Sequence, residues 1–365
     1  MIALVALTAL LVYAAVVCRL LHGLRALRPQ VHAARPRVSV VCAARNEAHN
    51  LDALLSCLMA QSYPPELLEV VIVDDRSSDG SAALLARWRA AHPRVKVVHL
   101  EELGPGIGAK KNALAHGIAA ATGEILLLTD ADCRPSPRWA EEMVGHFAAE
   151  VGLVAGFAPL LGEGVLAGVV AVDTLASALV AAGGVGLHRP TTCTGRNLAF
   201  RRQAYAEVEG YQKFMYAVSG DDDLLLHQVS QRTDWQVQYA VSPATFVPSA
   251  APRTLRQLLA QRRRHLSAGR YYPAGVKARY ALLHLCNLCL FVAPVWAALG
   301  GSGLPLCSLL LCAKVAVDLK ALLLAGRAFA QRFSWWAFCL WEMYFVLTNV
   351  LLGPLSWLGR IRWRE

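Results

Sequence analysis

The order of apolar and polar positions divides the 365-residue chain into three parts. Long apolar runs occupy its beginning and its end, and between them short apolar runs alternate with segments of helical spacing. An apolar run of roughly 20 residues can cross a bilayer as a helix, whereas runs of roughly four to eight residues are typical of buried strands. The pattern therefore predicts an α/β domain flanked by membrane segments.

The first apolar run, residues 1–18, carries no charge and is followed by basic residues. Secretory signal peptides carry their positive charge before the apolar region instead. We therefore expect an uncleaved anchor over residues 1–21, with its N-terminus outside and the chain entering the cytoplasm. The basic residues that follow the run are Arg19, Arg25, Arg28, Arg35 and Arg37.

The C-terminal region, residues 280–357, contains three apolar stretches. The outer two are expected to span a membrane. The middle one is a weaker candidate for a span because Lys314, Asp318 and Lys320 interrupt it. Four crossings would leave the basic tail GRIRWRE outside, against the positive-inside tendency. One segment is therefore expected to be re-entrant or interfacial. The stretches are residues 280–299, 304–325 and 334–354.

The middle of the chain, residues 37–275, is predicted to form one α/β domain. Strand and helix alternate along it, which implies a mostly parallel sheet covered on both faces, with ligands bound at the carboxyl ends of the strands. Two apolar or basic segments, about 165–187 and 253–272, are expected to be buried or membrane-surface helices of this domain. The predicted strands are 37–44, 68–75, 95–100 and 124–132, and the predicted helices are 50–61, 80–92 and 109–121.

Composition agrees with a membrane protein and narrows its partners. With 56% hydrophobic and 17% charged residues, the chain is too apolar for an ordinary soluble protein. The net charge of +10 comes from basic residues beside the membrane segments, which favours anionic lipid headgroups as partners and argues against nucleic acid. The 10 cysteines lack disulfide or zinc spacing, so we expect free thiols.

Carboxylates follow three of the predicted strands. Glu47 comes after the first, Asp74 and Asp75 after the second, and Asp130 and Asp132 after the fourth. A single D-x-D is weak evidence, because Asp often forms turns at strand ends. Three such clusters on one sheet edge favour a hard divalent cation that also holds a diphosphate. The loop GPGIGAKKN lacks both the P-loop and the dinucleotide-binding pattern, so neither an ATPase nor a dehydrogenase is supported.

Seven motifs, taken in their order and spacing, resemble those of membrane-bound family 2 glycosyltransferases, which have the GT-A fold. The resemblance covers most of residues 37–275. The anchor, the small C-terminal membrane region and the closing IRWRE are similar to the ceramide glucosyltransferase-like branch and related bacterial enzymes. The motifs are VSVVCAARNE, VIVDDRSSDGS, AKKNALAHGI, LLLTDADC, TGRNLAF, SGDDDLLL and QRRRH.

The resemblance implies a nucleotide-sugar site on this edge. Asp75 would contact the base and ribose, with Glu47 and Asp74 nearby. Asp130 and Asp132 would hold Mg²⁺ or Mn²⁺, with Asp130 also facing the donor. The roles of two lysines and one further aspartate have alternatives. Lys110 or Lys111 would lie near the nucleotide or its phosphates, and Asp79 either completes the donor motif or caps a helix.

The run SGDDDLLL is expected to supply the catalytic base. Inverting sugar transfer needs a group that takes the proton of the acceptor hydroxyl. Alignment with the family's G-[DE]-D pattern makes Asp222 this base, with Asp221 as the alternative. TGRNLAF resembles an acceptor-side loop, which would place Gly195 and Asn197 near the acceptor, although Asn197 has the alternative of closing a turn.

The run QRRRH departs from the family's Q-x-x-R-W. Gln261 and Arg264 remain and would bind the donor diphosphate. His265 stands where tryptophan is usual and would lie on the acceptor side, without an indole to stack there. The alternative is a basic amphipathic helix on lipid headgroups.

Together these features predict an inverting, metal-dependent transfer of sugar, from a UDP-sugar by expectation, to a membrane lipid. The enzyme would be a multi-pass cell-membrane protein with a cytoplasmic catalytic domain. A processive polysaccharide synthase is an alternative that needs more spanning helices. A non-catalytic membrane scaffold is a second alternative, and the intact motifs argue against it.

Overall fold

The computed structural model describes residues 2–28, 32–300 and 303–356. The chain forms two compact units. We call Arg28–Gly162 with Pro190–Ala251 the sheet unit. Met1–Leu27, Glu163–Arg189 and Pro252–Gly359 form the helical unit. The tail motif IRWRE lies outside the described residues.

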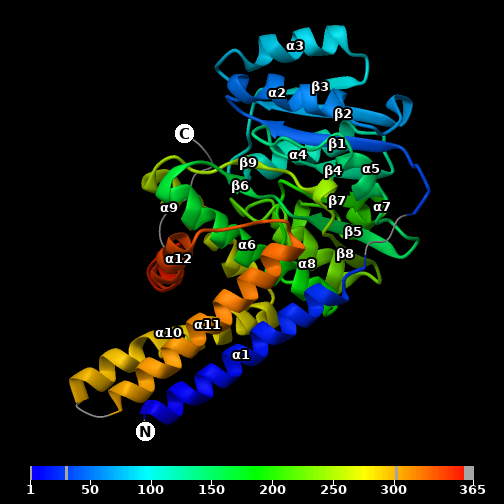
Figure 1. Cartoon of the computed structure of the whole chain (residues 1–365). Coiled ribbons are helices and arrows are strands. Elements are labelled where there is room, and N and C mark those ends of the chain that lie inside the picture. The colour runs from blue at the N-terminus through cyan, green and yellow to red at the C-terminus, as the bar shows by residue number, and fades with distance from the viewer. Residues whose placement is uncertain (1, 29–31, 301–302, 357–365) are drawn as a thin grey trace. The chain divides into compact units, whose positions relative to one another are not determined.

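The sheet unit is built on a seven-stranded sheet with the order β3-β2-β1-β4-β7-β5-β8 (Figure 1). Neighbouring strands pair in parallel except for β7, which is antiparallel to both β4 and β5. A second sheet pairs β6 with β9. The strands are β1 (Val38–Ala44), β2 (Leu68–Asp75), β3 (Val95–Leu100), β4 (Ile125–Leu128), β5 (Val151–Gly156), β6 (Leu160–Leu161), β7 (Leu198–Arg201), β8 (Gln236–Ala240) and β9 (Ser249–Ala250).

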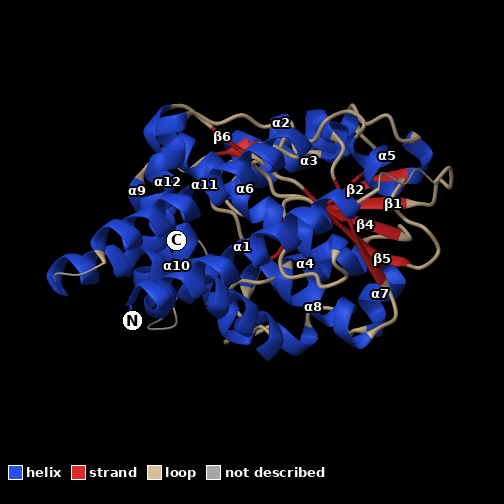
Figure 2. Cartoon of the chain, turned by 60° about the horizontal axis from the view of Figure 1, so that its bottom comes forward, coloured by secondary structure: helices blue, strands red, loops and turns tan. Residues whose placement is uncertain are grey.

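Helices cover both faces of this sheet (Figure 2). Val40 and Cys42 share a buried cluster with α2 and α5, whereas Val41 and Val73 face Gly117 of α4 from the opposite side. Burial on both faces explains why β1 is apolar at nearly every position. The helices are α2 (Ala48–Met59), α3 (Ser81–Ala91), α4 (Ala109–Ala120), α5 (Trp139–Val144), α7 (Arg202–Glu207) and α8 (Asp223–Arg232), with short 3₁₀ helices η1 (Pro65–Leu67), η2 (Gln212–Phe214) and η3 (Pro243–Thr245).

The predicted α/β fold and its first four strands and three helices are confirmed, with one difference at the fourth strand. It was predicted over 124–132, but β4 ends at Leu128. The chain then turns, and the backbone N–H of Cys133 donates to the carbonyl of Asp130 at 3.1 Å. Asp130 and Asp132 therefore lie in a turn after the strand.

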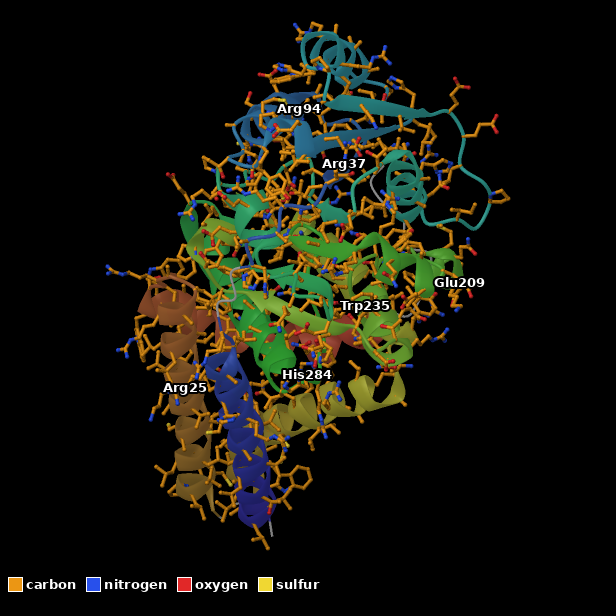
Figure 3. All side chains as sticks on the ribbon, turned by 90° about the vertical axis from the view of Figure 1, so that its right-hand side faces the viewer. Arg25, Arg37, Arg94, Glu209, Trp235 and His284 are labelled. Atoms are coloured by element: carbon orange, nitrogen blue, oxygen red, sulfur yellow. The ribbon has the colours of Figure 1, made fainter. Side chains whose placement is uncertain are left out.

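The helical unit gathers the apolar helices of the chain. Helices α1, α10 and α11 pack against one another, and α6 packs against α1, α11 and α12. Arg25, one of the basic residues that follow the first apolar run, lies in the last turn of α1 (Figure 3). The helices are α1 (Ile2–Ala26), α6 (Gly164–Gly186), α9 (Leu255–Ser267), η4 (Ala268–Tyr271), α10 (Ala274–Gly300), α11 (Leu304–Ala328), α12 (Trp335–Leu347), the π-helix η5 (Thr348–Leu352) and α13 (Gly353–Leu355).

Helix α6 joins this unit through close backbone contact with α1. A Cβ at Gly183 would lie 2.5 Å from the carbonyl oxygen of Leu20, and one at Gly186 would lie 1.9 Å from that of Gly23. Small residues that let backbones approach are typical of packed membrane helices. Because α6 and α9 both belong to the helical unit, the sheet unit is narrower than the predicted domain of residues 37–275.

Within the described part of the chain, the three helices α1, α6 and α10 are long and apolar enough to cross a membrane. The last predicted span, 334–354, differs from expectation, because α12 has 13 residues. At about 1.5 Å per residue this helix falls short of the roughly 30 Å hydrocarbon core, and the turns after it are π-helical. The predicted free thiols are confirmed for all 10 cysteines.

Candidate active site

The polar clusters after β1 and β2 are neighbours because these strands pair in parallel, with Ala44 opposite Asp74. Asp75 is fully buried and accepts two hydrogen bonds from Arg76, from Nε at 2.7 Å and from Nη2 at 3.0 Å. Arg76 has a φ of 56°, a left-handed conformation that turns its side chain back onto its neighbour. The sequence analysis did not single out Arg76, whose only local signal is its place after two aspartates.

The carboxylate of Asp74 also contacts other residues of the sheet unit. Its Oδ2 lies 3.1 Å from Nδ1 of His99 on β3, and its Oδ1 accepts a 3.3 Å hydrogen bond from the backbone of Ser77. Asp74 therefore closes the turn after β2 and links it to the next strand.

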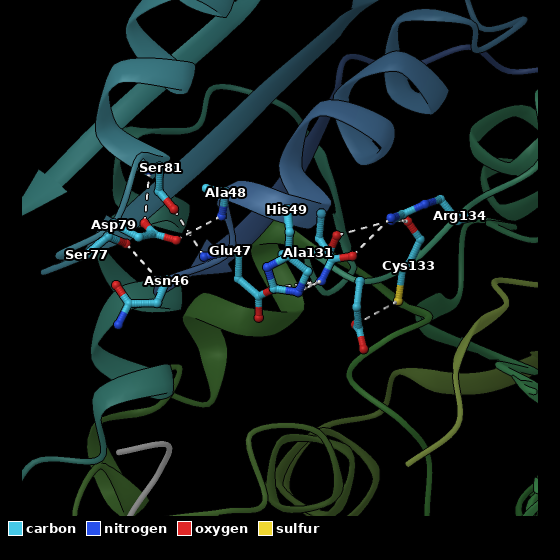
Figure 4. Close-up of polar contacts among 12 residues, drawn as sticks. Asn46, Glu47, Ala48, His49, Ser77, Asp79, Ser81, Ala131, Cys133 and Arg134 are labelled. Atoms are coloured by element: carbon cyan, nitrogen blue, oxygen red, sulfur yellow. Dashed lines mark hydrogen bonds and ion pairs between the residues drawn. The ribbon is translucent and has the colours of Figure 1, made fainter. Parts of the chain in front are cut away.

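Glu47 is held against this turn by the loop that precedes α2. Its backbone N–H donates to Oγ of Ser81 at 3.1 Å, and its Oε2 accepts from Asn50 at 2.8 Å. The neighbouring Asn46, at a φ of 55°, accepts from the backbone of Ser78 at 2.8 Å. Figure 4 shows Glu47 and Asn46 beside Ser81 and Ser77. The predicted donor-side carboxylates therefore lie together.

Asp79 acts as a cap for two helices. Its Oδ1 accepts from the backbone N–H of Ser81 at 2.9 Å, and its Oδ2 accepts from that of Ala48 at 3.1 Å (Figure 4). Both side-chain oxygens are used at helix starts, which supports the capping alternative for this residue.

The turn after β4 that holds Asp130 and Asp132, which we call the D-x-D turn, lies beside β1, because β4 pairs with β1 in parallel. Burial and the nearby charge of Asp130 raise the pKa of Asp132. Two hard carboxylate donors that repel each other suit a divalent cation, which would relieve the repulsion. Within residues 2–28, 32–300 and 303–356 no cluster of three His, Cys, Asp or Glu side chains surrounds a metal position. The remaining ligands would have to come from a diphosphate and water.

Lys110 connects this turn to the aspartate run. Its Nζ lies 2.9 Å from Oδ1 of Asp130 and 3.1 Å from Oδ2 of Asp221. Burial opposes the charge of this ammonium, but the two carboxylates outweigh burial and raise the pKa of Lys110. The same cations, Lys110 and Lys111, overcome burial at Asp221 and lower its pKa.

Lys111 has a different position from its neighbour. Its side chain is 1% exposed and donates to the carbonyl oxygen of Ser219 at 2.9 Å and to that of Ala217. Burial lowers the pKa of Lys111 to about 8. Lys111 therefore anchors the loop before the aspartate run, and of the two lysines only Lys110 lies at the carboxylates of the D-x-D turn.

The three aspartates of SGDDDLLL have three different surroundings. Asp223 accepts from Thr192 and from the backbone of Cys193, each at 2.8 Å. Asp222 is the N-cap of α8 and accepts from the backbone N–H groups of Gly195 and Asp223, also at 2.8 Å. Partial burial and the charges of Asp223 and Asp221 raise the pKa of Asp222 to about 7. Asp222 is thus the one whose proton affinity suits exchange near neutral pH.

Gly195 permits the close approach of its loop to these aspartates. A Cβ at this position would lie 2.9 Å from Oδ2 of Asp221 and 3.5 Å from Nζ of Lys110. Any other residue would have to displace the Lys110–Asp221 pair. The structure therefore brings together Gly195, Lys110, Asp130, Asp221 and Asp222.

Asn197 does not belong with them. Its side chain is fully buried, accepts from Nε1 of Trp139 at 3.0 Å, and donates to the carbonyl oxygens of Phe157 and Thr245 at 2.9 and 2.8 Å. The amide is used within the fold, so the expected acceptor-side position is replaced by a structural one.

Gln261, Arg264 and His265 lie on α9 of the helical unit, which is described separately from the sheet unit. Arg262, between them, forms an ion pair with Asp173 of α6 and donates from Nε to Oη of Tyr344 of α12 at 2.7 Å. The basic motif is thus attached to the apolar helices through Arg262, a residue of the run for which contact with lipid headgroups was the alternative.

Comparisons with known proteins identify the family of the chain. The family description Glycosyl transferase family 2 matches residues 39–170, and Glycosyl transferase family group 2 matches residues 125–361. Glycosyltransferase AglE of Haloferax volcanii is 33% identical over 122 residues, which are 33% of this chain and 39% of the relative. Beta-monoglucosyldiacylglycerol synthase of Synechocystis sp. is 34% identical over 115 residues, 31% of this chain and 23% of the relative.

A longer match is the probable glycosyltransferase YdaM of Bacillus subtilis, which is 24% identical over 255 residues, 67% of this chain and 58% of that protein. The chain thus spans less than two thirds of these relatives. The solved mannosyltransferase PcManGT from Pyrobaculum calidifontis, in complex with GDP-Man and Mn²⁺, shares the fold, with a TM-score of 0.61, 24% identity and coverage of 90% of this chain and 98% of that one. Since one family description covers well over half of the sequence, this chain belongs to glycosyltransferase family 2.

Proposed function

We propose that the chain transfers a sugar, with inversion, from a nucleotide-sugar donor to a membrane lipid at the cytoplasmic face. The observation that carries the proposal is the Lys110 bridge, with its Nζ 2.9 Å from Asp130 and 3.1 Å from Asp221. This bridge joins the D-x-D turn to the loop of the proposed base. Donor and acceptor chemistry need to meet at such a point.

On the donor side, Asp75 with Glu47 and Asp74 would bind the base and ribose. Asp75 is already paired with Arg76, so a nucleotide base would compete for or share that pairing. The proposed donor is a UDP-sugar, and a GDP-sugar is the alternative to be compared with it, because PcManGT was solved with GDP-Man.

Asp130 and Asp132 would hold Mg²⁺ or Mn²⁺. Such a cation, when bound, offsets the negative charge that develops on the departing nucleoside diphosphate. Lys110 also pairs with Asp130, so the lysine keeps the turn in place and opposes the mutual repulsion of the carboxylates. Gln261 and Arg264 of α9 are proposed to contact the diphosphate.

Asp222 would act as the general base. The acceptor hydroxyl oxygen forms a bond to the anomeric carbon while the bond from that carbon to the diphosphate oxygen breaks, and the hydroxyl proton passes to Asp222. A pKa of about 7 keeps a large fraction of Asp222 ionised at neutral pH while it remains basic enough to accept this proton. Its two backbone donors fix the direction of the carboxylate.

A lipid acceptor is supported by the apolar helices and by a relative named Beta-monoglucosyldiacylglycerol synthase. The test is an assay of the purified full chain in nanodiscs with a panel of UDP- and GDP-sugars and extracted lipids, with and without EDTA. We expect one donor to give a glycolipid product that disappears in EDTA, and Asp132→Asn to abolish it without changing expression. Full product formation in EDTA would show that the reaction needs no metal ion. No product from any donor would favour a non-catalytic scaffold.

The sheet unit is proposed to lie in the cytoplasm, and the basic flanks of the membrane helices are proposed to contact anionic lipid. Ala83 of α3 is exposed and offers a site for a cysteine. In a cysteine-depleted background, Ala83→Cys should react with a membrane-impermeant maleimide only after the cells are opened. Reaction in intact cells would invert the topology.

A further inference from the structure

A cluster of ionisable side chains that belong to none of the proposed active-site groups is buried in the helical unit. Nζ of Lys314 on α11 donates to Oε2 of Glu342 on α12 and lies 2.8 Å from Oδ2 of Asp318, one turn along α11. Oη of Tyr13 on α1 donates to Oδ1 of Asp318 at 2.7 Å. Phe291 of α10 covers the ammonium, with 4.9 Å between Nζ and the ring centroid. The helices α1, α10, α11 and α12 therefore all contribute to this cluster.

The charges of this cluster do not balance if every group is ionised. Lys314 is 0% exposed, Asp318 is 4% and Glu342 is 5% exposed, so one cation faces two buried carboxyls. The other acid on a packed helix, Asp173 of α6, is engaged by Trp341 at 3.2 Å and by Arg262. Lys320, the remaining charged residue of α11 before its last turn, is exposed. A net negative charge inside apolar helices is strongly unfavourable, because the desolvation of the surplus carboxylate has no cation to offset it.

We infer that this cluster binds one exchangeable proton, carried by Glu342. Both carboxyls lie beside the ammonium of Lys314, but Asp318 is the better carboxylate because it also accepts a hydrogen bond from Tyr13. Oε1 of Glu342 has no hydrogen-bond partner among the described residues, so it offers a place for the proton.

Asn287 of α10 supports this inference independently. It is 2% exposed, and neither atom of its amide has a hydrogen-bond partner within the described part of the chain. Asn287 lies one helical turn before Phe291 and so on the helix face that meets Lys314. Its amide supplies polar atoms for an acid proton or for a bridging water.

With this proton the cluster is neutral, and α11 can cross a membrane despite its charges. Helices α1, α10 and α11 would then be the spanning bundle, with the ionisable groups of α11 facing its interior. The short α12 would supply Glu342 without spanning by itself. Such an arrangement also agrees with a cytoplasmic C-terminus under the positive-inside tendency.

The first test uses dicyclohexylcarbodiimide, an apolar reagent that reacts with protonated carboxyls in membranes. The full chain in native membranes is treated at neutral pH, and the adduct is mapped by mass spectrometry. We expect labelling of Glu342 that declines as the pH rises and is absent in Glu342→Gln. A water-soluble carbodiimide should label surface acids instead. Absence of an adduct at Glu342 in the folded protein, or an adduct at Asp318 alone, would overturn the assignment.

The second test removes one charge at a time and measures the melting temperature in detergent. Glu342→Gln leaves a neutral Lys314–Asp318 pair and should change the melting temperature by no more than a few degrees. Lys314→Met leaves two acids without a cation and should lower it by about 10 °C. Lys320→Met, on the exposed side of the same helix, is the matched control and should have no effect. Equal damage from Glu342→Gln and Lys314→Met would mean that Glu342 is ionised and that no proton is bound.

Discussion

Each unit of the molecule holds a lysine between two carboxyl groups, and the two arrangements differ in their access to water. In the sheet unit, Lys110 lies between Asp130 and Asp221, and the side chains of Lys110 and Asp130 are 16% and 30% exposed. In the helical unit, Lys314 lies between Asp318 and Glu342, and its side chain is 0% exposed. The same combination of one lysine and two carboxyl groups thus occurs at an open strand edge and inside a helix bundle.

This difference decides what the surplus negative charge is for. At an open edge the charge remains ionised and is available to a metal ion or a substrate that arrives from solution. Inside apolar helices no such ligand is present, and a carboxyl lowers its energy by keeping a proton. One arrangement is therefore suited to binding and catalysis and the other to holding helices together.

The strongest test of this contrast is Asp222→Asn. If the aspartate run of the sheet unit performs proton transfer, kcat should fall by roughly 10²- to 10⁴-fold while the dissociation constant of the nucleotide stays near the parent value. Steady-state kinetics and calorimetry measure the two quantities. Asp223→Asn keeps an acceptor oxygen for Thr192 and is the matched control. A larger loss of kcat in Asp221→Asn would transfer the role of base to Asp221.

A second test asks whether a buried lysine of the sheet unit is also structural. Lys111→Met would leave two carbonyl oxygens, those of Ala217 and Ser219, without their donor. Unfolding free energy should fall by about 1–3 kcal/mol, and activity should fall with it as the loop loosens. Lys96→Met, which removes a half-exposed ion pair with Glu69, should cost about 1 kcal/mol or less. Unchanged stability and turnover in Lys111→Met would show that the loop does not depend on this anchor.

A third test examines competition between Lys110 and a metal ion. Because Lys110 pairs with Asp130, Lys110→Gln should strengthen Mn²⁺ binding by about 10-fold. Electron paramagnetic resonance of free Mn²⁺ measures this without nucleotide, and Asp130→Asn should abolish the binding. Equal or weaker affinity in Lys110→Gln would show that the lysine and the cation do not share Asp130.

The smallest expected effect is a shift in pH dependence. Asp222 accepts a proton only when ionised, so kcat should rise with pH through about 7 and then level off. Asp223→Asn removes a like charge and should move the midpoint to lower pH by about half a unit. If the midpoint stays the same or moves to higher pH, the rise of kcat with pH belongs to a group other than Asp222.

The raised pKa of Asp222 also predicts how the stability of the folded protein changes with pH. Its pKa is about 7 when folded and about 4 in an unfolded chain, so the folded state holds the proton more tightly. Its contribution to stability is complete below about pH 4 and is lost as the pH rises through about 7. Thermal melts of Asp222→Asn should lack this part of the pH dependence.

Much of the site was predictable because its signals are local. The apolar runs before Asp75 and Asp130 define strands, and parallel pairing carries their ends to one edge of the sheet. The roles of neighbouring lysines were not predictable in this way. Successive residues of a helix point about 100° apart, so Lys110 reaches carboxylates while Lys111 reaches carbonyls. The packing of α4 against the loop of residues 217–219 decides which lysine contacts carboxylates and which contacts carbonyl oxygens.

The sequence by itself determined the α/β order, the strand-end carboxylates, the family and the apolar helices, because each depends on residue type and short-range period. The tertiary structure decided that the amide of Asn197 is structural, that α6 joins the helical unit, and how the charges within the apolar helices are partnered. These depend on which distant groups meet. Asp173 and Lys314 look like interruptions of apolar segments until Arg262 and Glu342, 89 and 28 residues away, are seen to be their partners. The free energy of a buried charge is set by its partners, and partners far apart in sequence are chosen by the fold.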